Sequence, residues 1–472
     1  MAISPEDLGP RAGVHLLNRC GFGPRPGDIR RVLDGGLERY ILEQLQAPPD
    51  PDLETRLSRF ATLNYPISQV LALYAADQRS IGPILDELYS AKLIRAVHSL
   101  NQLREVLVDF WFNHFNVYLF SGNFERLSMG AYEREAIRPH ALGRFRDLLG
   151  ATAQHPAMLS FLDNYLSSVS RVVNGRTVGG INENYGRELM ELHTVGVSAG
   201  YTQTDVIEAA RCFTGWTIDS VRSGGNFVYR ASAHDPGAKQ VFGLSVPAGG
   251  GREDGDKLLD YLAAHPATAH HVSFRLVQRF VADDPPATLV DRCAQTFLRS
   301  SGDIPEVMKT ILGSAEFWAE AFGAGQAKTP LEFVAGAMRA LDAQVTSARG
   351  AASYLAAMGM PLYACVPPTG YSNRGSDWTN PSSHLQRMNF ALELAAGAIP
   401  GAAVDGRALA RSLGASADDA ASVVAALSSE VFGRALSAAT VATASRAGAG
   451  GGVSVAAKAA GLCLASPEGQ AR

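Results

Sequence analysis

A short polar segment between Asn182 and Trp216 holds the side chains of this chain that are best suited to chemistry. A helix through the segment, at about 100° per residue, places an amide, a guanidinium and two carboxylates on one narrow face. The four residues are Asn184, Arg187, Glu188 and Glu191, with Tyr185 on the face beside them. In an enzyme, Glu188 would be the general acid or base, Arg187 would neutralise an anionic group of the substrate, and Asn184 would orient it.

A simpler interpretation of this face is a solvated surface. Arg187 can pair with Glu183 and Glu191 one turn away on either side, which stabilises a helix by only about 0.2–0.5 kcal/mol per pair. Asn182 and Tyr185 favour a functional site, because amide and phenol groups are a poor choice for a purely solubilising surface. The face is therefore the leading candidate site, and Tyr185 is included among its catalytic residues.

The dipeptide His234-Asp235 is the second candidate for catalysis. A histidine can carry a proton near neutral pH, and Lys239 could add a cation nearby. Pro236-Gly237 follows at once and places the pair in a turn, so phosphohydrolases that carry a His-Asp pair on a helix are rejected as a comparison. The alternative is an Asx-type turn in which the Asp235 carboxylate accepts backbone amide hydrogen bonds.

Several other polar side chains are predicted to bind the substrate. They are His114, Asn116, Arg138, His140, Asp163, Asn182 and Lys239. His114 could equally be a core histidine, because it lies in the aromatic block that ends at Tyr118. A mixed histidine and carboxylate metal site is a further alternative, but no H-x-x-x-H, H-x-H or E-x-x-H spacing supports it. The sequence predicts no metal site and no cofactor.

Other familiar motifs are absent or out of context. The run from Gly196 to Gly200 fits G-x-S-x-G, but a nucleophile elbow needs a preceding strand, and here a helix is expected. No P-loop and no strand followed by G-x-G-x-x-G occurs, so nucleotide binding by these routes has no support.

Composition narrows the class of protein. The 472 residues carry a net charge of -4 at pH 7, which gives no sign of a nucleic-acid surface. The five cysteines form no C-x-x-C pair, which argues against a disulfide framework and a thiolate zinc site. No apolar run approaches the ~18 residues of a membrane helix. The start of the sequence lacks a basic region followed by an apolar core, so we expect a cytoplasmic protein.

Helical periodicity predicts the elements that would hold these residues. Apolar residues recur at three and four residue steps over 83–115, which predicts one long helix that ends in the aromatic block. Residues 328–343 are amphipathic with Pro330 in the first turn. Thr204 is expected to cap the helix after the polar segment, because acidic residues follow it.

The fold expected is mainly α, a single large multi-helix domain with a small β-hairpin or loop insertion. The insertion falls near 221–250, where alternating and turn-rich sequence replaces the helical pattern. The helical core would span 1–400, and the Ala/Gly-rich helical segment 401–472 would complete the same domain.

Several segments together resemble the domain of unknown function 1800 family of bacteria. In chain order they are AYEREAIRPHALGRFRDLL, HPAMLSFLDN, NENYGRELMELHTVG, YTQTDVIEAARCFTGW, AHDPGAKQVFG, KTPLEFVAGAMRAL and ASPEGQAR, and the resemblance runs from about Leu16 to the end. The resemblance implies a predominantly helical fold but transfers no reaction. It also implies frequent export and a possible sulfatase-like protein partner. The sequence departs from the family in having no visible signal, and also at His193 and at Gly469-Gln-Ala.

Two classes of function follow. The first is an acid/base enzyme, a hydrolase or lyase, that acts on an anionic or polyhydroxylated small molecule such as a glycan. The second is a non-catalytic helical scaffold or partner protein whose polar clusters are buried networks. A metal-dependent hydrolase that uses histidine and carboxylate ligands is a third alternative. Neither nucleic acid nor membrane is an expected partner.

Overall fold

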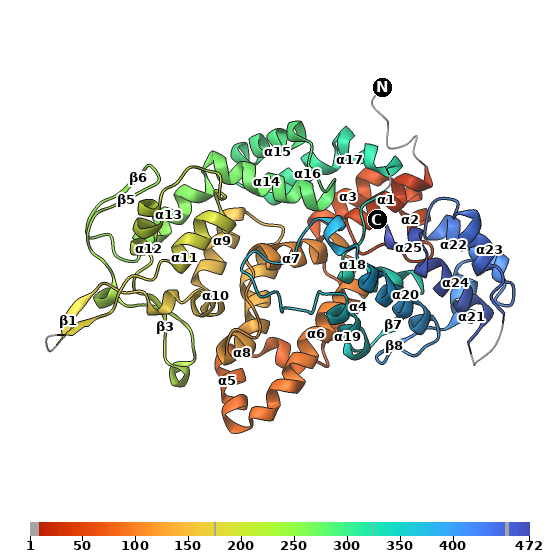
Figure 1. The fold of residues 1–472 in the computed structure, drawn as a ribbon, viewed down its shortest axis with the longest axis horizontal. Coiled ribbons are helices and arrows are strands. Elements are labelled where there is room, and N and C mark those ends of the chain that lie inside the picture. Colours follow the sequence, from red (N-terminus) through yellow and green to blue (C-terminus); the bar gives the residue numbers. More distant parts are fainter. Residues whose placement is uncertain (1–8, 174–175, 324, 449–452) are drawn as a thin grey trace.

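Helices dominate the fold, and each sheet among the described residues has two short strands (Figure 1). The computed structural model describes residues 9–173, 176–323, 325–448 and 453–472. The protein is therefore mainly α, as the periodicity predicts. No helix in these ranges is both long enough and apolar enough to span a membrane.

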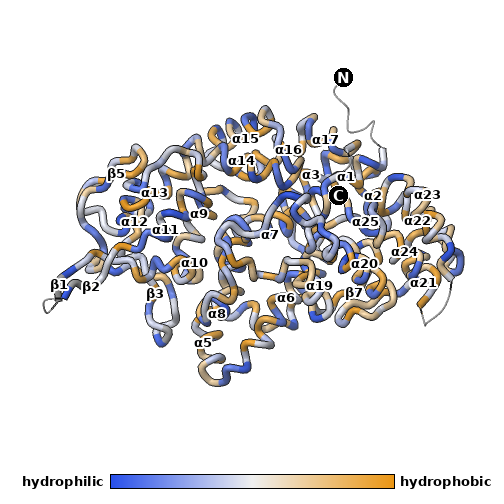
Figure 2. Tube along the Cα trace, in the orientation of Figure 1, coloured by the Kyte–Doolittle hydropathy of each residue, from blue (hydrophilic) through white to orange (hydrophobic). Residues whose placement is uncertain are grey.

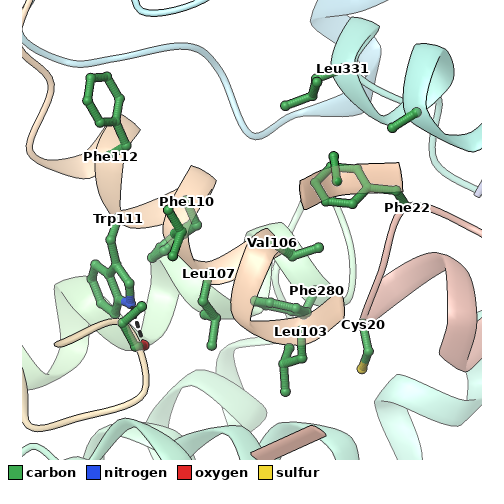
Figure 3. Close-up of a cluster of buried hydrophobic side chains, with 14 of the residues drawn as sticks. Cys20, Phe22, Leu103, Val106, Leu107, Phe110, Trp111, Phe112, Phe280 and Leu331 are labelled. Atoms are coloured by element: carbon green, nitrogen blue, oxygen red, sulfur yellow. Dashed lines mark hydrogen bonds between the residues drawn. The ribbon is translucent and has the colours of Figure 1, made fainter. Parts of the chain in front are cut away.

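The first helices of the chain build the centre and one side of the molecule. They are α1 (Pro10–Arg19), α2 (Asp28–Gly35), α3 (Leu37–Gln46), α4 (Pro51–Leu57), α5 (Ile67–Ala76), α6 (Ile81–His98), α7 (Gln102–His114) and α8 (Asn123–Ala131). α7 is buried on nearly every face, and its buried side chains include polar ones such as Gln102 and Glu105 as well as apolar ones. Its aromatic block is buried too, and the indole of Trp111 donates to the carbonyl of Ala141 at 3.1 Å (Figure 3).

The long helix expected over 83–115 is in fact two helices. The chain leaves helical geometry between α6 and α7, where the amide of Leu100 donates to Asp50 at 2.7 Å. The Asn101 side chain also donates to the carbonyl of Pro48 at 2.6 Å. These tertiary hydrogen bonds override the helical periodicity, because they satisfy backbone and amide groups at the break.

The middle of the chain alternates short helices with three hairpins. The helices are α9 (Phe145–Gln154), α10 (Pro156–Phe161), α11 (Asn184–Glu188), α12 (Gln203–Cys212) and α13 (Glu253–Ala263). The antiparallel hairpins are β1 (Arg171–Val173) with β2 (Arg176–Val178), β3 (Trp216–Ile218) with β4 (Phe227–Tyr229), and β5 (Lys239–Val241) with β6 (Leu244–Val246). The last two hairpins confirm the insertion near 221–250, and the first was not anticipated.

The rest of the chain returns to helices. They are α14 (Pro266–Phe280), α15 (Ala287–Arg299), α16 (Ile304–Leu312), α17 (Ala315–Ala319), α18 (Pro330–Ala340), α19 (Arg349–Ala357), α20 (Pro381–Ala395), α21 (Gly406–Ser412), α22 (Ala420–Glu430), α23 (Ala438–Ala444), α24 (Val455–Ala465) and α25 (Pro467–Gln470). One further strand pair, β7 (Gln344–Val345) with β8 (Ala402–Ala403), lies among them. The expected helix over 328–343 is α18, and all of its residues are buried.

The Ala-rich end of the chain packs closely because its side chains are small. Apolar residues line much of α22 and α24 (Figure 2). A Cβ added at Gly461 would lie only 2.8 Å from the Cβ of Ala395, so α24 approaches α20 at a distance that only glycine permits. One continuous core cluster includes residues from Ala12 to Ala465. The boundary at residue 400 stays a prediction.

The two ends of the described chain meet. The last residues pair with the segment before α18, because the amide of Lys328 donates to Gln470 at 2.9 Å and that of Arg472 donates to Gln326 at 2.8 Å. Helix α1 lies beside them (Figure 1). The first and last segments therefore form one wall of the molecule together with α18.

Candidate functional site

On the polar face predicted from the sequence, Arg187 forms ion pairs with its neighbours. Arg187 contacts Glu183 at 3.2 Å and Glu191 at 3.8 Å, and it also donates to Gln203 at 2.9 Å. These contacts match the solvated-surface alternative. Burial, and next the charge of Glu191, raise the pKa of the half-buried Glu188 carboxyl.

The local backbone differs from the uniform helix that we expected. After α11 the chain makes a π-helical turn over Leu189–His193, and the next helix is capped by Thr202 rather than Thr204. The Thr202 and Asp205 side chains form a complete capping box. Within this segment, the side-chain oxygen of Asn182 accepts a hydrogen bond from the backbone amide of Asn184 at 2.9 Å, which is a turn contact.

Tyr185 requires a correction. Its side chain is 1% exposed and meets the ring of Phe213 edge to face, with the centroids 5.0 Å apart. Burial raises the pKa of its hydroxyl. The residue belongs to the core beside the polar face and cannot contact a substrate in this conformation.

If the Arg187 pairs are only a surface network, Arg187→Ala should change the free energy of unfolding by less than about 1 kcal/mol. All three side chains of the ion pairs are at least one quarter exposed, at 36%, 38% and 27% for Arg187, Glu183 and Glu191. Urea denaturation followed by circular dichroism measures the difference. A loss of several kcal/mol would show that this face is a structural core.

His234 and Lys239 lie in a second, deeply buried cluster. The His234 ring faces the Thr214 carbonyl through Nδ1 at 2.8 Å and the Asp254 carboxylate through Nε2 at 3.2 Å. The Lys239 amine donates to the same Asp254 oxygen at 2.6 Å, and the side chains of both residues are fully buried. Both residues were predicted for the site, but the cluster fixes the insertion against α13 and leaves Lys239 no access to a substrate.

Asp235 forms the Asx-type turn that was the alternative to catalysis. Its carboxylate accepts the amide of Gly237 at 2.8 Å and pairs with Arg211 at 2.8 Å. The hydrogen bond from Arg211 lowers the pKa of the Asp235 carboxyl. The hydrogen bond and the ion pair of the Asp235 carboxylate therefore stabilise the turn and are not contacts to a ligand.

His114 and Asn116 are also core residues. His114 is 3% exposed, and its Nε2 lies 3.1 Å from the carbonyl of His193. Burial, reinforced by Arg275, keeps the pKa of His114 well below its usual value. The Asn116 amide donates to the carbonyls of Cys365 and Pro367 at 3.0 and 2.8 Å. A direct role in substrate binding is wrong for both in this conformation.

Arg138 belongs to a third cluster, which is balanced in charge. It donates to Glu105 at 2.8 Å and to Glu133 at 2.8 Å, and the Tyr363 hydroxyl donates to Glu133 at 2.6 Å. Lys92 pairs with Asp109 at 2.9 Å beside them. The two cavities along this cluster have volumes of about 10 Å³ each, enough for about one water molecule.

The remaining predicted residues lie apart from these clusters. Asp163 is exposed and adopts a left-handed turn with φ of 57°. His140 is half-buried, and its carbonyl accepts the amide of Gly143 at 3.0 Å. The predicted residues are thus distributed over several hydrogen-bonded clusters.

A cavity of about 210 Å³ lies instead where the two ends of the chain meet. Its walls come from α1, the turn after α17, the second half of α18 and the C-terminal segment. The polar lining consists of Arg11, His15, Asn18, Glu320, Lys328, Arg434, Glu468 and Arg472. The small residues Gly23, Gly336 and Ala340 also line the cavity and leave it open.

Cations exceed anions in this lining. Four cationic side chains and two carboxylates line the cavity. Glu468 accepts hydrogen bonds from neutral donors, the Ser437 amide at 2.8 Å and the Thr440 hydroxyl at 3.0 Å, while Arg472 pairs with Glu332 outside the lining. Burial opposes the ionisation of Glu468, but the hydrogen bond from the Ser437 amide helps to lower its pKa to about 2. The excess of positive charge favours an anionic ligand.

Further cations lie buried next to the cavity. The Arg19 side chain is fully buried, and burial lowers its pKa to about 10. Among the described residues, its Nε and Nη2 have no hydrogen-bond partner, nor does Nε of Arg472. Arg279 contacts Glu332 at 2.7 Å, and Arg472 shares that carboxylate. Guanidinium donors without partners are unusual because their desolvation is costly.

His15 and Asn18 add two more unpaired groups. Each is less than 9% exposed and lines the cavity, and among the described residues His15 Nε2 and Asn18 Oδ1 have no hydrogen-bond partner. Burial, followed by the charge of Arg19, lowers the pKa of His15 to about 3, so its ring is neutral. The cavity thus offers acceptors as well as cations.

A larger groove of about 670 Å³ lies on the other side of the C-terminal segment. Its lining includes Met388, Leu462 and Pro467, and no charged side chain is among the described residues that form it. Among these residues His384 is the one titratable side chain, and the lining offers no counter-ion, so the smaller cavity is the better candidate site.

Two parts of this cavity carry a signal in the sequence. Arg472 lies in ASPEGQAR and Lys328 begins KTPLEFVAGAMRAL, which are two of the segments that carry the family resemblance. Arg11 and Lys328 are separated by more than 300 residues, so no spacing along the chain could show that they share a cavity.

These features define a mainly α protein with a cation-rich cavity between its first and last segments. A family model described as "Protein of unknown function (DUF1800)" matches residues 15–471, so the chain belongs to that family. Comparisons with curated proteins and with solved structures give no match. Within the described residues, no group of three or more His, Cys, Asp or Glu side chains is placed to hold a metal ion.

Proposed function

We propose that this protein binds a small anionic ligand in the cavity between α1, α18 and the C-terminal segment. The observation that carries the proposal is the imbalance of charge. Four cations face two carboxylates in the lining, and buried guanidinium donors behind it have no partner among the described residues. A carboxylate, phosphate or sulfate group in the cavity would pair with the cations of its lining through charge-assisted hydrogen bonds.

The ligand would also carry hydroxyl groups or a ring. Phe322 lies at the cavity, is 51% exposed, and has the guanidinium of Arg11 at 5.5 Å from its ring centroid. An exposed aromatic face beside polar groups suits a sugar ring. An acidic sugar therefore fits the proposed site better than a simple inorganic ion does.

Acid/base chemistry on such a ligand would use groups that line the cavity. Glu320 offers a carboxylate that can act as a general base, and the neutral ring of His15 can accept a hydrogen bond from the ligand at Nε2. Glu320 thus replaces Glu188 and His234 as the proposed base. Glu320→Gln should then abolish turnover of an acidic glycan while leaving its binding intact.

A titration with small anions tests the binding proposal. D-glucuronate, D-galacturonate, phosphate and sulfate are added to the purified protein, and heats are recorded by calorimetry. We expect at least one anion to bind, and the double variant Arg11→Ala, Arg434→Ala to bind it at least tenfold more weakly, since two charge-assisted contacts are lost.

Arg299→Ala is the matched control, because Arg299 is an exposed arginine of α15 outside the cavity lining. This variant should bind the anion as the unmodified protein does. Equal affinities for all three proteins, or no binding of any anion, would refute the proposal.

A helical scaffold without catalysis is the second candidate. The clusters around Asp254 and Glu133 favour it, because their hydrogen bonds join distant segments and reach no ligand-sized cavity. The two candidates make different predictions for the anion titration.

A further inference from the structure

Lys328 has an unusual position in the cavity. It precedes α18, and its side chain folds back along that helix, so its Nζ lies 3.9 Å from the place of a Cβ on Gly336. Gly336 is two turns further on, and its missing side chain leaves room for the amine. The amine therefore lies at the wall of the cavity and does not extend into solvent.

The contacts of the amine leave it largely unpaired. It donates to the carbonyl of Gly469 at 3.1 Å, and among the described residues no carboxylate oxygen lies within the 4.0 Å of an ion pair. Glu332 is the nearest acidic residue in sequence, but Arg279 and Arg472 already share its carboxylate. The amine thus has free hydrogen-bonding capacity toward the cavity.

The surroundings favour the neutral amine. Burial lowers the pKa of Lys328 to about 8; Glu332 opposes this shift, while Arg387 and Arg434 add to it. A lysine that is desolvated next to other cations is an activated nucleophile. With a pKa of about 8, roughly one tenth of the amine is neutral at pH 7, compared with about one in 2,500 for an ordinary lysine.

The other five lysines lack this combination. Four of them pair with carboxylates: Lys92 with Asp109 at 2.9 Å, Lys239 with Asp254 at 2.6 Å, Lys257 with Glu253 at 3.9 Å and Lys309 with Glu306 at 2.7 Å. Lys458 lies on α24 and lines neither the polar cavity nor the apolar groove.

We propose that Lys328 is a nucleophile that forms an imine with the carbonyl carbon of a small anionic aldehyde or 2-oxo acid. This inference rests on the proposed anion site, since a guanidinium of Arg11 or Arg434 would pair with the carboxylate of the ligand. The neutral amine attacks the carbonyl carbon and gives a carbinolamine. Both amine protons then leave with the carbonyl oxygen as water, and the C=N bond forms without oxidation or reduction.

Reductive trapping tests the inference. The protein is incubated with pyruvate or glyoxylate and sodium cyanoborohydride at pH 7, and peptide mass spectrometry follows labelling at all six lysines. We expect Lys328 to be labelled at least tenfold faster than Lys458 in the same molecules. Its rate should rise about tenfold per pH unit below pH 8 and level off above it. This comparison needs no variant.

Two lysine variants and one competing ligand, lactate, extend the test. Lys328→Arg keeps the charge and should remove the fast adduct, whereas Lys458→Arg should retain it. Lactate carries the carboxylate but no carbonyl carbon for an amine to attack, so it should slow labelling of Lys328 and not that of Lys458. Thermal denaturation shows whether Lys328→Arg is folded.

The outcomes separate the two proposals. If lactate binds and the Arg11→Ala, Arg434→Ala variant loses it, but Lys328 is labelled no faster than Lys458, the imine is refuted and the anion site stands. Both proposals fail if two results are obtained together. The first is that neither lactate nor pyruvate binds to the unmodified protein or to the Arg11→Ala, Arg434→Ala variant, and the second is that all accessible lysines are labelled at the same rate.

Discussion

Replacing Asp254 by alanine is expected to lower the free energy of unfolding by about 3–5 kcal/mol, because it leaves a buried charge without its partner. Lys239 and Asp254 are both fully buried at 2.6 Å, and the His234 ring lies 3.2 Å from the same carboxylate. Removing the carboxylate leaves the ammonium group with only the carbonyls of Asp235 and Gly237. Urea denaturation followed by circular dichroism measures the loss.

Asp256→Ala provides the matched control on the same helix. Asp256 is one third exposed, and its contacts are long, at 3.8 Å with Arg146, 3.9 Å with Arg252 and 3.4 Å with the amide of Gln154. We expect its loss to change stability by less than about 1 kcal/mol. Equal effects of the two substitutions would mean that the buried cluster does not stabilise the insertion.

Glu133→Gln should lower stability at pH 7 by about 3 kcal/mol and make it less sensitive to acid. Burial opposes the ionisation of Glu133, but the charges of Arg138, Lys92 and Arg95 outweigh it and lower its pKa from 4.5 to about 2. A shift of this size corresponds to about 3 kcal/mol.

The sign of the pH dependence follows from the lowered pKa. The stabilisation is fully present above about pH 4.5 and is lost as the pH falls toward 2, because the unfolded chain takes up the proton first. The difference between the variant and the unmodified protein should therefore shrink between pH 4.5 and 2. Denaturation series at pH 7, 5, 4 and 3 measure it.

Glu135→Gln is the control for this experiment, since Glu135 lies in the same π-helical turn but is 49% exposed. Its substitution should leave both stability and acid sensitivity nearly unchanged. A constant difference between Glu133→Gln and the unmodified protein across this pH range would contradict the assigned role.

Local patterns were enough to predict the helical class but not every break in a helix. Pro330 and the Thr329 cap define α18 within a few residues of the expected start. The break between α6 and α7 depends on hydrogen bonds from Leu100 and Asn101 to residues some 50 positions earlier. Such contacts leave no periodic signal in the sequence.

The candidate site, too, could be predicted only in part from local sequence patterns. The helical wheel correctly placed Arg187 beside Glu183 and Glu191, and their mutual pairing was one of the two interpretations. Residue types alone could not show that Arg19 is buried with unpaired donors, because its charged neighbours come from α14, α18 and the turn that holds Glu320. The cavity is a product of tertiary structure.

The meeting of the two chain ends has a consequence for synthesis of the protein on the ribosome. Arg11 is among the first described residues to emerge and Arg472 is the last, yet both line the cavity. Domains fold while the chain is being made, from the N-terminus onward. Helix α1 therefore cannot complete the cavity before residues 467–472 have been made, and a nascent chain that stops short of residue 467 would lack one wall of the cavity. Ligand binding would thus report that this segment has been made and has folded.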